Sequence, residues 1–309
     1  FPYTTLFRSV LPEQIIVGAG TEYLYGLLIQ LLGNEKIYAV ENPGYRKIGK
    51  IYQSYKVLCK YIDMDEEGVE ISKLEENQVD IAHISPSHHY PTGIVMPVSR
   101  RYELLGWAAK SENRYIIEDD YDSELRLSGQ PIPTLQSMDV SDKVIYMNTF
   151  TKTLASTVRI SYMILPRELF QQYYKKLSFY SCTVSNFEQY TLAKFIEEGY
   201  FEKHINRLRN YYHNKRNTIV ETIKKSRLNQ YVSISGEEAG VHFLMKIETK
   251  KPQEQLMENA KAQGIKLSPL SAYYKENREE IQNTYVMNYS SIELEKIEMV
   301  VTRLAKCCE

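Results

Sequence analysis

Short apolar segments alternate with longer amphipathic segments from residue 13 to residue 166. Nearly continuous apolar and β-branched runs predict strands that are buried on both faces, at 15–18, 36–41, 55–62, 79–85, 114–120, 143–150 and 159–166. Between these runs, residues 21–32 and 96–112 repeat apolar side chains at the i, i+3, i+4 spacing of a helix. Alternation of this kind is typical of a mostly parallel sheet covered by helices, here with about seven strands.

The pattern changes after residue 185. Residues 186–226 form one long helical pattern, and shorter strand and helix patterns at 231–248, 252–265 and 284–307 indicate a small α+β domain. We therefore predict a large domain at 10–185, followed at 186–309 by an interdomain helix and a smaller C-terminal domain.

The first nine residues, FPYTTLFRS, differ from the rest of the chain. Back-translated, they spell a common sequencing adapter, so we interpret residues 1–9 as a non-native scar. On this interpretation the natural gene begins further upstream.

The composition argues against several classes of protein. The chain has 309 residues, of which 43% are hydrophobic and 25% charged, as in ordinary globular proteins. Lys and Arg number 38 against 39 Asp and Glu, so the net charge of -1 offers no overall attraction for nucleic acid or an anionic membrane. No apolar run reaches the roughly 20 residues of a membrane span. The four cysteines lack CxxC spacing. We expect a soluble cytoplasmic protein with reduced cysteines and no metal site.

Charged side chains stand at the ends of two predicted strands. Asp119 closes the strand at 114–120, and Lys152 follows the strand at 143–150, 33 positions later. In an open α/β sheet, ligands bind beyond the carboxyl ends of the strands. We therefore expect this carboxylate and this amine to share one crevice.

Further residues at predicted strand ends add an anion site and an aromatic face. Gly20 ends a glycine turn that leads into a helix beginning at Thr21, which offers backbone N–H groups and a positive dipole end. Arg159 adds a cation suited to phosphate, and Tyr45 adds a ring. Asp119 could pair with a ring nitrogen, and the amine of Lys152 could bond to an aldehyde. Together, these residues match the chemical groups of pyridoxal phosphate.

Four motifs then give a specific resemblance: HISPSHHYPTGIVMP, IIEDDYDSELR, NTFTKTLASTVRISYMI and FIEEGYFEKHINRLRNYYHNKR. In order and spacing they resemble the aminotransferase-like domain of MocR-type regulators, a branch of the GntR family, over about residues 11–304. The resemblance implies an α/β protein of the pyridoxal-phosphate-dependent transferase fold type I. It also implies pyridoxal 5′-phosphate as the cofactor and a homodimer as the assembly.

The resemblance implies roles for individual residues. Lys152 would bond covalently to the cofactor, Asp119 would pair with the ring nitrogen, and Tyr121 would donate to the ring phenolate oxygen. Tyr45 would stack on the ring. The phosphate would be held by Gly20, Thr21, Thr149 and Arg159.

Several of these residues also suit an ordinary structural role. A lone lysine in a threonine-rich loop is usually a solvated surface charge. Asp119 suits a helix N-cap, which leaves Asp120 and Asp122 as alternatives for the ring partner. Arg159 suits an ion pair with a nearby acid, and Tyr45 suits a packed or rim position.

Two further features are interpreted as structural. Adjacent His88 and His89 precede a proline, so we expect their side chains to point apart and to shape the turn. The basic stripe at 204–216 is expected to be an exposed helix face.

Two departures from the family pattern bear on catalysis. A Tyr-Pro pair at 90–91 replaces the usual Asn-Pro, which leaves Tyr121 as the contact to the ring oxygen. Val286 stands about where amino-acid-binding relatives carry an arginine for the substrate carboxylate, with Lys275 and Arg278 nearby but out of register. Cofactor binding is therefore predicted more firmly than transamination.

Our first hypothesis is the effector domain of a MocR-type transcription regulator that binds pyridoxal phosphate and an amino acid or amine. Its winged-helix DNA-binding domain would lie upstream of this sequence, so DNA would be contacted only there. The alternative is a free-standing class I/II aminotransferase, in which Lys152 would also shuttle a proton. A lyase or decarboxylase on the same cofactor is the third hypothesis.

Overall fold

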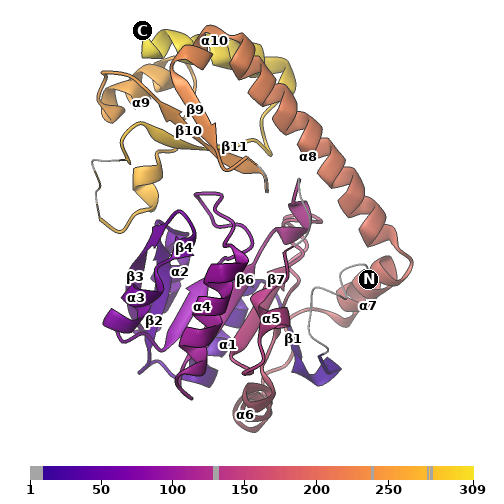
Figure 1. The fold of residues 1–309 in the computed structure, drawn as a ribbon. Helices are drawn as coiled ribbons and strands as arrows, with labels where there is room; N and C mark the ends of the chain where they lie inside the picture. Colours follow the sequence, from indigo (N-terminus) through magenta and orange to yellow (C-terminus); the bar gives the residue numbers. More distant parts are fainter. Residues whose placement is uncertain (1–9, 128–131, 238–239, 277, 279–280) are drawn as a thin grey trace. The chain divides into compact units, whose positions relative to one another are not determined.

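The computed structural model describes residues 10–127, 132–237, 240–276, 278 and 281–309. The chain divides into two compact units (Figure 1). Of the described residues, the first unit contains 10–89, 94–124 and 132–204, and the second contains 90–93, 125–127 and those from 205 onward. The scar predicted at 1–9 lies outside the described residues.

The first unit is built on an eight-stranded sheet in the order β1-β8-β7-β6-β5-β2-β3-β4. The strands are β1 (Ile15–Gly18), β2 (Ile37–Asn42), β3 (Leu58–Asp65), β4 (Gly68–Val69), β5 (Ile81–Ile84), β6 (Tyr115–Asp120), β7 (Val144–Thr149) and β8 (Ser161–Ile164). Strands β7, β6, β5, β2 and β3 are parallel neighbours, whereas β8 is antiparallel to both β7 and β1. The predicted mostly parallel sheet is confirmed. The count of seven missed β4, whose two residues are too few to leave a hydrophobic pattern.

Helices cover both faces of this sheet. They are α1 (Thr21–Leu32), α2 (Arg46–Ser54), α3 (Ile71–Glu76), α4 (Val98–Ala109), α5 (Leu135–Met138) and α6 (Arg167–Leu177). The helix that follows in the same unit, α7 (Asn186–Glu197), has no buried residue. Consecutive strand residues point to opposite faces. Tyr38 and Val40 accordingly pack in the core with α1 and α6, while Ala39 packs in the core with α3 and α4. Burial on both sides explains why the strands are apolar throughout.

The predicted helices at 21–32 and 96–112 are present as α1 and α4. The single helical pattern at 186–226 is wrong in one respect, because the chain forms α7 and then α8 (Tyr200–Lys225). Gly199 separates them with φ 74°, and its N–H donates to the carbonyl of Ile196. This left-handed glycine is a common helix terminator that apolar periodicity does not reveal.

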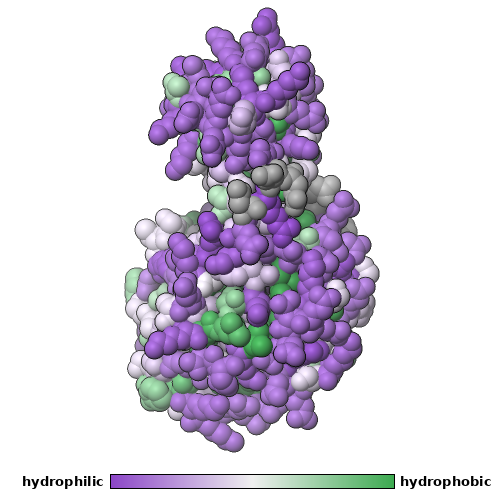
Figure 2. Space-filling view, turned by 90° about the vertical axis from the view of Figure 1, so that its left-hand side faces the viewer, coloured by the Kyte–Doolittle hydropathy of each residue, from purple (hydrophilic) through white to green (hydrophobic). Residues whose placement is uncertain are grey.

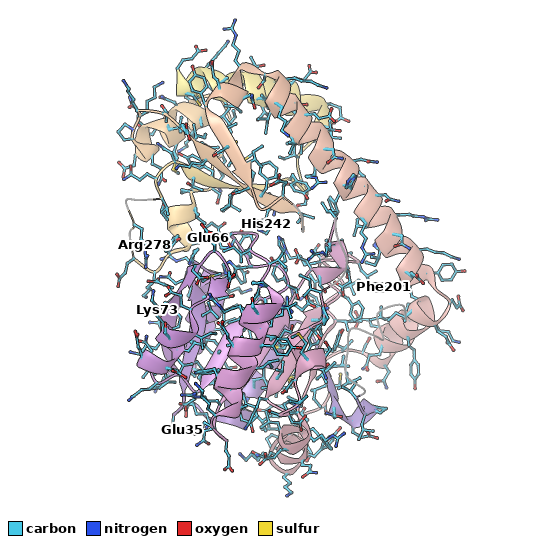
Figure 3. All side chains as sticks on the ribbon, in the orientation of Figure 1. Glu35, Glu66, Lys73, Phe201, His242 and Arg278 are labelled. Carbon is cyan, nitrogen blue, oxygen red and sulfur yellow. The ribbon has the colours of Figure 1, made fainter. Side chains whose placement is uncertain are left out.

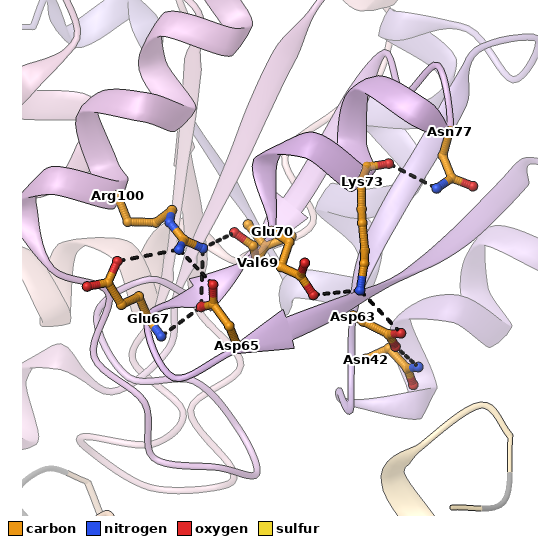
Figure 4. Close-up of polar contacts among 9 residues, drawn as sticks. All are labelled: Asn42, Asp63, Asp65, Glu67, Val69, Glu70, Lys73, Asn77 and Arg100. Atoms are coloured by element: carbon orange, nitrogen blue, oxygen red, sulfur yellow. Dashed lines mark hydrogen bonds and ion pairs between the residues drawn. The ribbon is translucent and has the colours of Figure 1, made fainter.

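The edge of the sheet formed by β3 and β4 is tied to two helices by ion pairs (Figure 4). Arg100 of α4 pairs with Asp65 at 2.7 Å and with Glu67 at 3.4 Å. Lys73 of α3 lies 3.6 Å from Asp63. All of these partners are at least partly exposed, so the network fixes the edge without burying charge.

The second unit is a three-stranded antiparallel sheet, in the order β11-β10-β9, packed with helices. Its elements are α8 from residue 205 onward, β9 (Val232–Ser235), β10 (His242–Ile247), α9 (Gln253–Ala262), β11 (Thr284–Asn288) and α10 (Ile297–Cys308). Their core includes Ile219, Phe243, Leu256, Tyr285 and Val301. The strand and helix patterns predicted beyond residue 230 are therefore present.

Short 3-10 segments complete the described chain. They are Pro12–Gln14, Ser123–Leu125, Arg227–Gln230, Leu270–Tyr273 and Leu294–Lys296.

On the face drawn in Figure 2 the surface is mostly hydrophilic, and only small groups of hydrophobic residues reach it. Among the helices of the described residues, none has the length and apolarity needed to cross a bilayer. All four cysteines are free.

Candidate functional site

The carboxyl ends of six strands lie at one edge of the large sheet. Strands β3, β2, β5, β6 and β7 are parallel, and β1 runs with them because β1 and β7 are both antiparallel to β8. Gly18 lies opposite Ser161, and Ser161 lies opposite Thr149, whose Oγ1 accepts a hydrogen bond from the Ser161 hydroxyl at 2.8 Å. Asp119 is on the neighbouring β6, opposite Met147. From strand spacing and rise, the Cα atoms of Asp119 and Thr149 are roughly 8 Å apart.

The glycine turn between β1 and α1 lies against a guanidinium group. Gly20 precedes α1 with φ 94°, and a Cβ placed on it would come within 2.6 Å of Arg159 Nη2. That same nitrogen donates to Glu22 at 2.7 Å, and Glu22 also pairs with Lys47. The hydrogen bond from Lys47 lowers the pKa of the Glu22 carboxyl against the opposing effect of partial burial. The N-terminus of α1 thus already carries an anion held by two cations.

Lys152 is exposed in a turn whose backbone is held on both sides. The carbonyl of the buried Thr153 accepts a hydrogen bond from His204 Nε2 at 2.7 Å. Phe201 of α8, labelled in Figure 3, packs edge-on against Phe150 with ring centroids 5.6 Å apart. The turn is therefore fixed by packing while the lysine side chain extends into solvent.

Asp119 is buried, with 6% of its surface exposed. Its Oδ2 accepts hydrogen bonds from the Tyr25 hydroxyl at 2.5 Å and from His83 Nε2 at 3.3 Å. The Tyr52 hydroxyl lies 2.6 Å from the other ring nitrogen of His83. The Oδ1 atom of Asp119 is also buried but has no hydrogen-bond partner among the described residues. One carboxylate oxygen is thus used by the protein, and the other is left for a donor from elsewhere.

The two alternative aspartates are engaged by the protein itself. Asp120 accepts a hydrogen bond from the Tyr146 hydroxyl at 2.8 Å. Asp122 accepts one from His88 Nδ1 at 2.9 Å. Among these acids, the contacts favour Asp119 as the partner of a bound ligand.

The two adjacent histidines contact different acids, as predicted. His88 bonds to Asp122, whereas His89 Nε2 lies 3.5 Å from Glu41 Oε2. Burial lowers the pKa of His89 to about 3, so this imidazole is neutral at neutral pH. Burial raises the pKa of Glu41 to about 8, so this carboxyl is largely protonated there. The expectation that the two rings point apart is confirmed.

Two tyrosines of the predicted set follow the ends of β2 and β6. Tyr45 immediately precedes α2 and is 52% exposed. Tyr121 follows β6, and its hydroxyl lies 3.3 Å from His88 Nδ1. All the residues predicted for the site belong to the first unit.

Three residues that make the contacts described above were not among those predicted from sequence: Glu22, Tyr25 and His83. Tyr25 lies four residues after Thr21 on the same face of α1. The available signals were a tyrosine within an apolar helix and a histidine within an apolar strand. Only the fold brings these side chains to one carboxylate.

Solved structures place this architecture in a class. The kynurenine aminotransferase of Pyrococcus horikoshii, crystallised with PMP, superposes with a TM-score of 0.81 at 27% identity, over 95% of this chain and 74% of that one. The fold is that of the pyridoxal-phosphate-dependent aminotransferases of fold type I.

Sequence comparison then gives the family. Residues 6–303 match the family described as aminotransferase class I and II, and the chain belongs to that family. The uncharacterized HTH-type transcriptional regulator YdeL of Bacillus subtilis is 40% identical over 85% of this chain and 57% of its own length. The probable rhizopine catabolism regulatory protein MocR of Rhizobium meliloti is 31% identical over 85% of this chain and 53% of its own length. The chain thus spans little more than half of each of these two relatives.

Pyridoxal 5′-phosphate is the cofactor of this family, and two observations show that the residues present fit it. The buried Oδ1 of Asp119 matches a protonated ring nitrogen. At Gly20, where a Cβ would come within 2.6 Å of Arg159 Nη2, the turn brings a guanidinium against the N-terminus of α1, so a cation stands beside backbone amides suited to an anion. The described residues hold no cluster of three or more His, Cys, Asp or Glu arranged for a metal ion.

Proposed function

We propose that this chain is the pyridoxal-phosphate-binding, ligand-sensing domain of a MocR-type transcription regulator, whose DNA-binding part precedes it in the full-length protein. The observation that carries cofactor binding is the buried Oδ1 of Asp119, which has no partner among the described residues. The regulator assignment is supported by YdeL and MocR, which are named as regulators and are almost twice as long as the part matched here.

Asp119 and Lys152 would hold opposite sides of the cofactor ring. Asp119 Oδ1 accepts the ring N–H, and the negative charge keeps that proton in place. Lys152 would provide the amine that bonds to the cofactor, and its exposed position would leave it accessible to an amine ligand. When bound, the cofactor supplies an electron-withdrawing ring that stabilises negative charge on the ligand carbon next to the amine.

The phosphate would be held at the start of α1. The backbone amides that follow Gly20, the Thr21 hydroxyl and the Arg159 guanidinium converge there. Arg159 would turn from Glu22 to the phosphate, which carries more charge and accepts a bidentate contact. Thr149 would complete the phosphate site from the end of β7.

The remaining roles complete the proposal. Tyr121 would donate to the ring phenolate oxygen, and Tyr45 would cover one face of the ring. The ligand would be an amino acid or another primary amine, and the assembly would be a cytoplasmic homodimer, as two-fold symmetric sites of this fold imply. The domain limits proposed from the sequence remain 10–185 and 186–309.

A free-standing aminotransferase is the second candidate. It is favoured by the match to 74% of the kynurenine aminotransferase chain. Against it, Val286 on β11 is buried and uncharged at the position proposed for the arginine that binds substrate carboxylate. In this reading Lys152 would also carry the proton between the ligand and the cofactor.

The test of cofactor binding is an absorbance spectrum of the purified protein with pyridoxal phosphate. The wild type should show the long-wavelength band of cofactor bonded to a lysine, and Lys152→Ala should lose it entirely. Lys194→Ala removes an exposed lysine of α7 and should keep the band. An unchanged band in Lys152→Ala would overturn the assignment.

The test between regulator and aminotransferase is a panel of amino acids and amines added to the loaded protein. As a regulator domain, the protein should change its spectrum with a ligand and recover it when the ligand is removed by dialysis. Release of an oxo acid from an amino acid over many turnovers, when a second oxo acid is supplied as the amino acceptor, would favour the aminotransferase instead.

A further inference from the structure

Tyr25 links helix α1 to the acid of the candidate site. Tyr25 is buried on α1, and its hydroxyl lies 2.5 Å from Asp119 Oδ2. Thr21, a residue proposed for the phosphate, lies one turn earlier on the same face of α1. The helix proposed to hold the phosphate thus also contacts the acid proposed for the ring nitrogen.

The direction of the hydrogen bonds around Asp119 follows from burial. Burial, followed by the charge of Asp119, raises the pKa of Tyr25 well above its ordinary value, so its hydroxyl keeps its proton and donates. Burial likewise raises the pKa of Tyr52, which therefore donates to Nδ1 of His83. With Nδ1 accepting from Tyr52, the ring proton of His83 lies on Nε2, which donates it to Asp119. Both donors reach the same oxygen, Oδ2.

The rings that carry these donors are themselves fixed. His83 packs edge-on against Tyr25 with centroids 5.0 Å apart and against Tyr52 with centroids 5.8 Å apart. Two directed hydrogen bonds on one oxygen prevent rotation of the carboxylate and stabilise its negative charge.

We propose that Tyr25, together with the Tyr52–His83 pair, positions Asp119: by occupying Oδ2 these residues hold the carboxylate in one orientation and turn Oδ1 toward the cofactor's ring nitrogen. This rests on the proposed role of Asp119. The three residues are positioning residues, because each acts on the cofactor through Asp119.

The experiment compares Tyr25→Phe with Tyr38→Phe. Tyr38 is a suitable control because it is fully buried in the same core and donates a single hydrogen bond, to the Gly33 carbonyl at 3.1 Å. The readouts are the dissociation constant for pyridoxal phosphate and the nitrogen NMR resonance of cofactor labelled with nitrogen-15 in the ring. Tyr25→Phe should weaken binding about tenfold and move the resonance toward the unprotonated ring. Tyr38→Phe should leave both readouts at the wild-type values.

Tyr52→Phe provides a second, independent variant. It removes the hydroxyl that fixes the tautomer of His83, and it should move the nitrogen resonance in the same direction by a smaller amount. If Tyr25→Phe does not fold, as judged by circular dichroism, an unmoved resonance in Tyr52→Phe overturns the proposal. Wild-type values in a folded Tyr25→Phe overturn it directly.

Asp119→Ala separates this inference from the proposed function. If Asp119→Ala changes binding and resonance while Tyr25→Phe does not, only the positioning role is wrong. If Asp119→Ala itself changes neither readout, the proposed role of Asp119 is wrong as well. In the Asp119→Ala background, Tyr25→Phe should have no further effect, because its partner is gone.

Discussion

The two ends of the proposed cofactor site are built differently. At the ring end, Asp119 is buried and its Oδ2 is held by two donors that are themselves buried. At the phosphate end, the pair of Arg159 and Glu22 is 50% and 36% exposed. The fold holds the carboxylate at the ring end in a fixed orientation. At the phosphate end, the guanidinium of Arg159 is instead paired with the carboxylate of Glu22.

This difference indicates what each end contributes. A buried, correctly oriented carboxylate gives orientation and is little affected by salt. Exposed ion pairs contribute little to stability and exchange partners easily. The ring end should therefore determine which cofactor state is held, and the phosphate end should determine how tightly a phosphorylated ligand is captured.

The largest effect expected at the phosphate end is that of Arg159→Ala. Loss of the guanidinium should weaken binding of pyridoxal phosphate about a hundredfold, because a charge-assisted contact to the phosphate is lost. Pyridoxal, which lacks the phosphate, should bind the variant as it binds the wild type. Asp119→Ala should weaken both ligands. Equal losses for the two ligands in Arg159→Ala would contradict the division between the ends.

Gly20→Ala should destabilise the folded protein by about 2 kcal/mol, because φ 94° is a region that other residues rarely adopt. The added Cβ would also push on Arg159, so phosphate affinity should fall as well. Gly106→Ala is the matched control, since nothing lies within 4 Å of its Cβ position in α4. Urea unfolding should find that control at least as stable as the wild type, and a stable Gly20→Ala would be inconsistent with the backbone described.

Buried acids near the ring end should make stability depend on pH. Burial raises the pKa of Glu124 to about 8 from an ordinary value of 4.5, so the folded state binds a proton that the unfolded state releases. Stability therefore falls as pH rises from about 4.5 to about 8, by up to about 1.4 kcal/mol per pH unit for this group. Glu124→Gln should flatten the dependence of the melting temperature on pH over that window. Glu197→Gln, at an exposed position, should not.

The smallest effect is expected from Arg100→Ala, at the β3–β4 edge. Its partners Asp65 and Glu67 are exposed, so the free energy of unfolding should change by less than about 1 kcal/mol. Cofactor affinity should not change. A loss of affinity there would mean that the ion pairs of the β3–β4 edge affect the site.

The sequence predicted the large sheet well because its strands are buried on both faces and leave continuous apolar runs. It also predicted which residues stand at the strand ends, since Asp119 and Lys152 each follow such a run. It missed β4, which is two residues long, and the break at Gly199, where a single glycine ends a helix inside an otherwise unbroken helical pattern.

The partners of the site residues were beyond reach of the sequence. Tyr25 and His83 are far from Asp119 along the chain, and they meet it only because α1 packs on the sheet beside β5 and β6. Glu22 is also far from Arg159 along the chain, so the sequence did not identify it as a partner. An ion pair between Arg159 and some nearby acid was nevertheless among the interpretations. Periodicity indicates which face of an element is buried, but it does not identify which polar atoms meet there.

The most direct test of the central claim is to reduce the loaded protein with borohydride and to map the modified peptide by mass spectrometry. Borohydride fixes the bond between the cofactor and its lysine, so the label marks the residue that held it. The account predicts a single pyridoxyl group on Lys152. A label on another lysine, or no label in protein that has bound the cofactor, would contradict it.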